Sequence, residues 1–156
     1  MLPVHRIFVT AALLATLSAC SGGEVRKAIN PPRASIQQIT VQPDGQWQLA
    51  VRLQNFSNVP TAFASVNVKL MVGGQEAGNI ALTPAITIGP ESADVLNTVL
   101  RPSLGAKLQA ASALSEGQSV RYSVAGTIVT KDPKGSYAVS YDSTLNPAPG
   151  LNGVLR

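Results

Sequence analysis

The chain holds one cysteine, Cys20, and one histidine, His5, residue types that often serve as nucleophile and general base. Residues 7–17 between them are mostly apolar and follow the basic Arg6. Such a run is too short to cross a bilayer as a helix, which needs about 20 residues. A short apolar run behind a basic N-terminus and ahead of small residues predicts an export signal, so we expect neither residue in an active site.

The end of this signal, Leu17-Ser18-Ala19-Cys20, resembles the lipobox of bacterial lipoproteins. The resemblance implies that the Cys20 thiol receives a diacylglycerol, that residues 1–19 are removed, and that the new amino group is acylated. It also implies the outer membrane, facing the periplasm, because Ser21 and Gly22 lack the aspartate that retains enteric lipoproteins in the inner membrane. An ordinary signal peptide followed by an incidental cysteine is the alternative.

The rest of the chain offers few groups for catalysis. Without histidine or a second cysteine, residues 21–156 have no imidazole base and no disulfide. No serine lies in a Gly-x-Ser-x-Gly or Ser-x-x-Lys motif. Glu91 and Asp94 lie close in the sequence beside a Gly-Pro turn, where solvation of the turn is a simpler role for them than acid catalysis. We therefore expect no catalytic residue, no metal and no cofactor. A calcium site would require the loops of three aspartates to converge: Asp44, Asp132 and Asp142.

Charge is sparse and mildly positive. Twelve basic and eight acidic residues give a net charge of +4, and only 13% of residues are charged. The cations are spread along the chain without a run, which argues against a nucleic-acid partner. Arg26 and Lys27 could contact anionic lipid headgroups, or they could be solvated residues of a tether.

Three parts follow the signal. Residues 20–33 are rich in glycine and proline, which predicts a flexible tether, and residues 147–156 predict an irregular tail. Residues 34–146 show short alternating runs separated by turn residues, which predicts an all-β domain: an immunoglobulin- or fibronectin-III-like antiparallel β-sandwich of about seven strands with one short helix. The expected strands cover residues 35–41, 47–54, 62–72, 75–82, 85–88, 93–101, 119–131 and 136–145.

Alternation assigns the faces of these strands. Apolar residues at every second position from Trp47 predict one buried and one wet face. In the next strand the even positions from Ala62 to Val72 are predicted to face inward, and Gly73-Gly74 predicts a type I′ hairpin turn. Residues 93–101 are apolar on both faces, which predicts a central strand.

One helix is predicted at residues 104–116, capped by Ser103 and stopped by Gly117. Its expected buried face, which would cover an end or open edge of the sandwich, consists of Leu104, Leu108, Ala111 and Leu114.

The last two strands are expected to meet at a type I turn of Asp132-Pro133-Lys134-Gly135. A bulge at Gly135 would change the register. The apolar pattern favours Ile128 opposite Val139, which places Gly126 opposite Tyr141.

Six aromatic residues remain for packing or binding. Trp47, Tyr122 and Tyr141 lie in alternating strands and are expected in the core. Phe56 and Phe63 flank the loop at residues 55–60, where they either plug one end of the sandwich or form an exposed patch for a partner or a lipid.

Several segments together resemble the LEA type 2 family, also called the water-stress and hypersensitive-response (WHy) domain, in its bacterial lipoprotein form. The family's Asn-Pro-Asn appears here as Asn55-Phe56-Ser57-Asn58-Val59-Pro60, with the proline displaced. The resemblance implies a seven-stranded sandwich with a short helix, no catalytic residues, and a role in desiccation or envelope stress with client proteins. Handling of lipid or a small apolar ligand is the alternative it leaves open, and an accessory subunit of an envelope complex is another. The segments that carry the resemblance are residues 47–55, the strand to Val72 with Gly73-Gly74, Gln75-Glu76-Ala77-Gly78, and Ile88-Gly89-Pro90-Glu91-Ser92.

Overall fold

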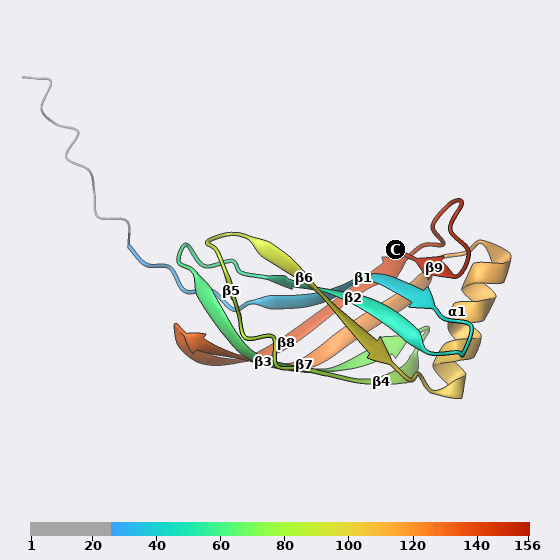
Figure 1. Cartoon of the computed structure of the whole chain (residues 1–156), viewed down its shortest axis with the longest axis horizontal. Helices are drawn as coiled ribbons and strands as arrows, with labels where there is room; N and C mark the ends of the chain where they lie inside the picture. The colour runs from blue at the N-terminus through green and yellow to red at the C-terminus, as the bar shows by residue number, and fades with distance from the viewer. Residues whose placement is uncertain (1–25) are drawn as a thin grey trace, which may run out of the picture.

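The computed structural model describes residues 26–156, which form two antiparallel sheets packed face to face (Figure 1). The all-β sandwich with one short helix is therefore confirmed. The first sheet has the order β6 (Ala93–Leu100), β2 (Trp47–Gln54), β1 (Arg33–Val41), β9 (Val154–Leu155). The second has the order β4 (Gln75–Leu82), β3 (Thr61–Val72), β7 (Val120–Asp132), β8 (Lys134–Leu145), and β5 (Ile86–Ile88) pairs with the start of β3.

Helix α1 (Leu104–Glu116) covers one end of the sandwich, and the chain enters β1 at the opposite end (Figure 1). We call these the helix end and the tether end. All sheet pairings are antiparallel, so paired strands run in opposite directions between the two ends.

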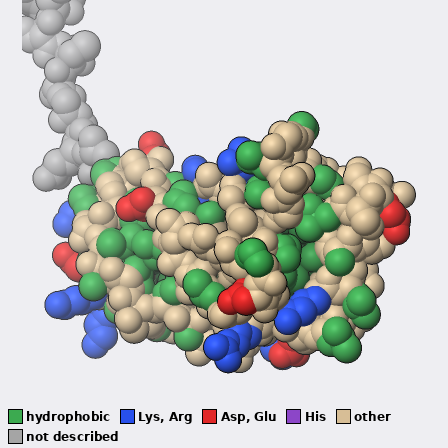
Figure 2. Space-filling view, turned by 45° about the vertical axis from the view of Figure 1, so that its right-hand side comes forward, with side chains coloured by type: hydrophobic (Ala, Val, Ile, Leu, Met, Phe, Trp, Pro, Cys, Tyr) green, Lys and Arg blue, Asp and Glu red, His purple; other side chains and the backbone are tan. Residues whose placement is uncertain are grey.

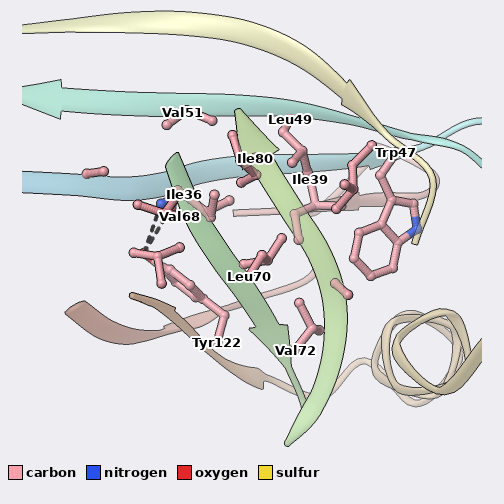
Figure 3. Close-up of a cluster of buried hydrophobic side chains, with 14 of the residues drawn as sticks. Ile36, Ile39, Trp47, Leu49, Val51, Val68, Leu70, Val72, Ile80 and Tyr122 are labelled. Atoms are coloured by element: carbon pink, nitrogen blue, oxygen red, sulfur yellow. Dashed lines mark hydrogen bonds between the residues drawn. The ribbon is translucent and has the colours of Figure 1, made fainter. Parts of the chain in front are cut away.

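The buried face that alternation predicts for β2 is the face that the structure confirms most fully. Trp47, Leu49, Val51 and Leu53 are each at most 1% exposed, and the residues between them face outward. Figure 3 shows Trp47, Leu49 and Val51 on the same side of the core as β1, facing Val68, Leu70 and Ile80 of the other sheet. The space between the sheets is thus filled by interdigitating side chains.

Two β-bulges change which side chains face the core, so that simple alternation assigns some residues to the wrong face. In β1 the register shifts between Ile36 and Gln38, so that Ile36 and Ile39 are both buried despite their odd spacing. In β3 it shifts between Phe63 and Ser65, which turns Phe63 inward and leaves Ala64 half-buried. The predicted inward face is therefore correct only from Val66 onward.

The hairpin turn at Gly73-Gly74 is confirmed. Both glycines have positive φ, 57° and 77°, and Val72 pairs with Gln75 across them. These are the conformations that a type I′ turn requires.

The prediction that residues 93–101 form a central strand is wrong. β6 is the edge of its sheet and pairs only with β2. Leu100 is buried and Leu96 packs against the core, whereas Val99 is 61% exposed. An apolar residue on each face was misleading because an edge strand can leave single apolar side chains in water.

The helix has the predicted caps but not the predicted face. Ser103 Oγ accepts from Ala106 N at 3.3 Å, and Gly117 ends the helix with a φ of 64°. The buried side chains are Ala106, Ala110 and Ala113, while Leu104 and Leu108 are 73% and 62% exposed.

Close packing explains this difference. The helix contacts β3, β4 and β7, and a Cβ at Gly73 of the β3–β4 turn would collide with the Gln109 side chain. The small side chains of Ala106, Ala110 and Ala113 let the helix approach the sheets closely. Leu104 and Leu108 are left exposed, whereas Leu114 packs partly against the core.

The hairpin of β7 and β8 has a register different from the expected one. Gly126 pairs with Val139 and Ile128 with Tyr137, and the strands join through Asp132-Pro133, whose peptide bond is cis. The two-residue loop is therefore Asp132-Pro133, one position earlier in the chain than the Pro133-Lys134 loop of the expected type I turn. The shift of two residues keeps each side chain on its face. Gly126 instead allows close approach of β3, because a Cβ there would meet the backbone of Asn67 and Val68.

The segment after residue 146 is also more ordered than expected. Val154 and Leu155 form β9, which pairs with Thr40 and Ile39 of β1. Both side chains are buried, so two apolar residues in a Pro- and Gly-rich segment were enough to complete the sheet.

Candidate functional site

Cys20, the predicted lipidation site, lies outside the described residues, so its modification stays a prediction. The first described residues, from Arg26, lie at the tether end (Figure 1). The candidate site is therefore the set of groups at this end, where an anchored chain would meet the domain.

The entering chain is fixed to the loop between β2 and β3. Ala28 N donates to Asn58 Oδ1 at 2.7 Å, and Asn58 N donates back to Ala28 O at 3.1 Å. Asn58 Nδ2 also donates to Arg26 O at 2.7 Å, and Asn30 Nδ2 donates to Phe56 O at 2.9 Å. The last residues of the expected tether thus lie along the domain.

Asn55 holds the β2–β3 loop to the loop between β5 and β6. Its side chain is 1% exposed, and Nδ2 donates to the carbonyls of Val59 and Gly89 at 2.8 and 2.9 Å. Its Oδ1 accepts from Ser57 N at 2.9 Å. Sequence reasoning treated Asn55 as a turn residue only; the available signal was a buried-strand pattern that continues directly into an asparagine.

The structure separates the two phenylalanines proposed as a partner-binding pair. Phe63 is 2% exposed and belongs to the core, as the plug alternative has it. Phe56 is half-buried, and its ring lies 4.8 Å from the Arg33 guanidinium. The two rings therefore form no common surface patch.

Arg33 lies between two aromatic rings, because Tyr141 of β8 lies 4.9 Å from the same guanidinium. We call Phe56, Arg33 and Tyr141 the arginine clamp. An adjoining hollow of about 330 Å³ is lined by the clamp and by Asn30, Pro31, Pro32, Ala34, Ala138, Val139 and Ser140. Sequence reasoning missed this site, since its residues are far apart in the chain.

A buried tyrosine stands behind the clamp. The Tyr122 hydroxyl donates to Ile36 O at 3.1 Å and accepts from Ile36 N at 3.2 Å, which ties β7 to β1 across the sandwich (Figure 3). Burial raises the pKa of this hydroxyl above its ordinary value of 10.0. The rings of Tyr122 and Tyr141 have centroids 6.3 Å apart, so the core supports the clamp directly.

The helix end carries apolar surface instead. A groove of about 180 Å³ between α1 and the β1–β2 turn is lined by Val41, Gly45, Trp47, Lys107, Ala111 and Leu114. Leu104 and Leu108 lie exposed on the same helix. This end can contact apolar groups, whereas the tether end offers hydrogen-bond donors and a cation.

The carboxylates considered for chemistry do not converge. Glu91 and Asp94 are exposed, and within residues 26–156 no group of three or more His, Cys, Asp or Glu residues could hold a metal ion. In the same range no helix is long and apolar enough to span a membrane. On the face seen in Figure 2, acidic and basic side chains are interspersed.

Comparison with known proteins gives structural likenesses only. No family model matches the chain. No curated protein sequence matches it significantly. Among solved structures, the chain is similar to a protein from Archaeoglobus fulgidus, with 15% identity, 78% of this chain and 98% of that chain covered, and a TM-score of 0.43. A protein from Arabidopsis thaliana has 11% identity, 77% and 78% coverage, and a TM-score of 0.48. A candidate late embryogenesis abundant (LEA) protein has 12% identity, 78% and 74% coverage, and a TM-score of 0.49.

Proposed function

We propose that the protein is a non-enzymatic lipoprotein, anchored through Cys20, whose LEA type 2-like domain protects other proteins during desiccation or envelope stress. The observation that carries this proposal is the filled core. Trp47, Leu49 and Leu70 are at most 1% exposed and occupy the space in which a sandwich would otherwise hold a ligand. Activity then resides on the surface.

The arrangement of the two ends supports the anchored form. The chain that leads back to Cys20 leaves at the tether end, and α1 lies at the other end (Figure 1). Lipid chains on Cys20 and its amino group would supply the two hydrophobic signals that stable anchoring needs. The exposed Leu104 and Leu108 would then point away from the outer membrane into the periplasm, where denatured clients expose apolar segments.

Carriage of a lipid or small apolar ligand is the second candidate, favoured by the apolar groove beside Trp47. At about 180 Å³ this groove is smaller than the roughly 300 to 1,000 Å³ of typical ligand sites. Leu104 and Leu108, expected on the helix face that covers the sandwich, face solvent instead. The structure therefore favours protection over carriage.

The test is protection of an unrelated, drying-sensitive enzyme by the purified full-length protein in neutral detergent. We expect less aggregate after drying and rehydration than with an equal mass of serum albumin, which controls for bulk protein. Protection no better than albumin, together with a stoichiometric lipid that survives purification, would replace the protective role with carriage.

A further inference from the structure

We propose that the arginine clamp is a binding site for a phosphate group. Arg33 begins β1, and the Phe56 and Tyr141 rings lie 4.8 and 4.9 Å from its guanidinium. Aromatic rings bind a guanidinium through its faces, by cation–π and stacking contacts. The N–H donors of the guanidinium lie in its plane, so ring contacts leave them available at the edge.

These donors have no protein acceptor among residues 26–156. In that range the ion pair that forms joins Lys69 and Glu76 at 3.0 Å, and the hydrogen bonds of the described side chains include none from Arg33. A guanidinium that is held in place but not neutralised is suited to bidentate binding of a phosphate.

The adjoining hollow has the size and charge that such a ligand needs. Its volume is about 330 Å³, and Arg33 is the charged residue of its lining, which includes no carboxylate. Ser140 also lines the hollow, from β8. The remaining lining includes prolines, alanines and a valine, none of which competes with a ligand for the guanidinium donors of Arg33.

The clamp is also held in place before any ligand binds. Tyr141 lies beside Tyr122, which is anchored to Ile36 by two hydrogen bonds. Phe56 lies in the loop fixed by Asn55, and its carbonyl accepts from Asn30. Little conformational entropy is therefore lost on binding.

Two sources could supply the phosphate: a phospholipid headgroup or free inorganic phosphate. The hollow lies at the tether end, from which an anchored chain would run to a membrane. The chemistry of the site is the same for both sources and does not depend on the anchor, so the proposal can fail or succeed separately from the proposed function.

The experiment is a ¹⁵N NMR titration of the full chain in neutral detergent, following the arginine Nε–Hε signals. Inorganic phosphate is one ligand and a short-chain phosphatidylglycerol is the other, at ionic strength held constant with chloride. We expect a saturable shift of the Arg33 signal. This signal is assigned to Arg33 by its absence from the spectrum of Arg33→Lys. Binding to the same variant, followed through the Ser140 amide signal, should be several-fold weaker, because lysine keeps the charge but loses the planar fork of N–H donors.

Arg101→Lys, at an exposed position of the helix end, is the matched control and should bind like the wild type. A response to both ligands supports a general phosphate site, and a response to the lipid alone supports a headgroup site. No saturable response to either ligand, or equal binding by Arg33→Lys with amide signals that show an intact fold, would overturn the proposal.

Discussion

The two ends of this sandwich are held by different forces. At the helix end, α1 lies on the sheets through Ala106, Ala110 and Ala113, next to the fully buried Trp47. At the tether end, Asn55 and Asn58 bond to the backbone of neighbouring segments. Apolar packing at the helix end leaves two leucines of the helix exposed to solvent. Hydrogen bonds at the tether end fix a surface on which the arginine clamp lies.

This difference makes the ends respond differently to mutation. Large losses are expected where apolar volume is removed or added at the helix end, because close-packed contacts are sensitive to size. At the tether end the losses should follow hydrogen bonds left without partners. Four substitutions test this contrast, from the largest effect to the smallest.

Trp47→Ala should lower the free energy of unfolding by about 3 to 5 kcal/mol, because it empties the core beneath the helix. Gln48→Ala, on the exposed face of the same strand, should change it by no more than about 0.5 kcal/mol. Denaturant unfolding measures both. Equal losses would mean that the faces of β2 are assigned wrongly.

Asn55→Ala should cost about 1 to 3 kcal/mol, since the Val59 and Gly89 carbonyls and the Ser57 N–H lose their partner. Asn67→Ala, on an exposed position of β3, is the control and should be nearly neutral. Hydrogen exchange should show faster opening of both loops at the tether end in Asn55→Ala alone. If exchange there stayed unchanged, Asn55 would not be the group that holds these loops.

Ala110→Leu should destabilise the protein by about 1 to 3 kcal/mol, because the larger side chain must push the helix off the sheets. Leu108→Gln, an exposed position with a residue of similar helix propensity, should change stability by no more than about 0.5 kcal/mol. Thermal and denaturant unfolding compare the pair. The reverse order of effects would restore the leucine face that the sequence pattern suggested.

Tyr122→Phe should cost about 1 kcal/mol at neutral pH, through the lost hydrogen bonds to Ile36. It should also change the pH dependence. The folded-state pKa is raised above 10.0, so wild-type stability is fully present below pH 10 and falls as pH rises toward the folded pKa. Tyr122→Phe should lack this part of the fall. Parallel curves for the two proteins would show that Tyr122 does not titrate as proposed.

Sequence reasoning predicted the sandwich, the helix and its caps, because periodicity and turn residues are local signals. It misplaced Ala64, since the β3 bulge between Phe63 and Ser65 is set by pairing with β7. The helix face was wrong because alanines lie against the sheets where the pattern had placed Leu104 and Leu108. The arginine clamp joins residues 33, 56 and 141, a contact that only the folded chain creates.

The central claim is that the domain has a filled core and is anchored only by lipid on Cys20. Native mass spectrometry of the protein extracted from the producing membrane, followed by denaturation, tests both parts at once. The account predicts a chain that starts at Cys20 with covalently bound diacylglycerol and acyl groups, and the same mass under native and denaturing conditions once weakly held detergent and ions are removed. An unmodified cysteine, or a stoichiometric lipid that is lost only on denaturation, would contradict it.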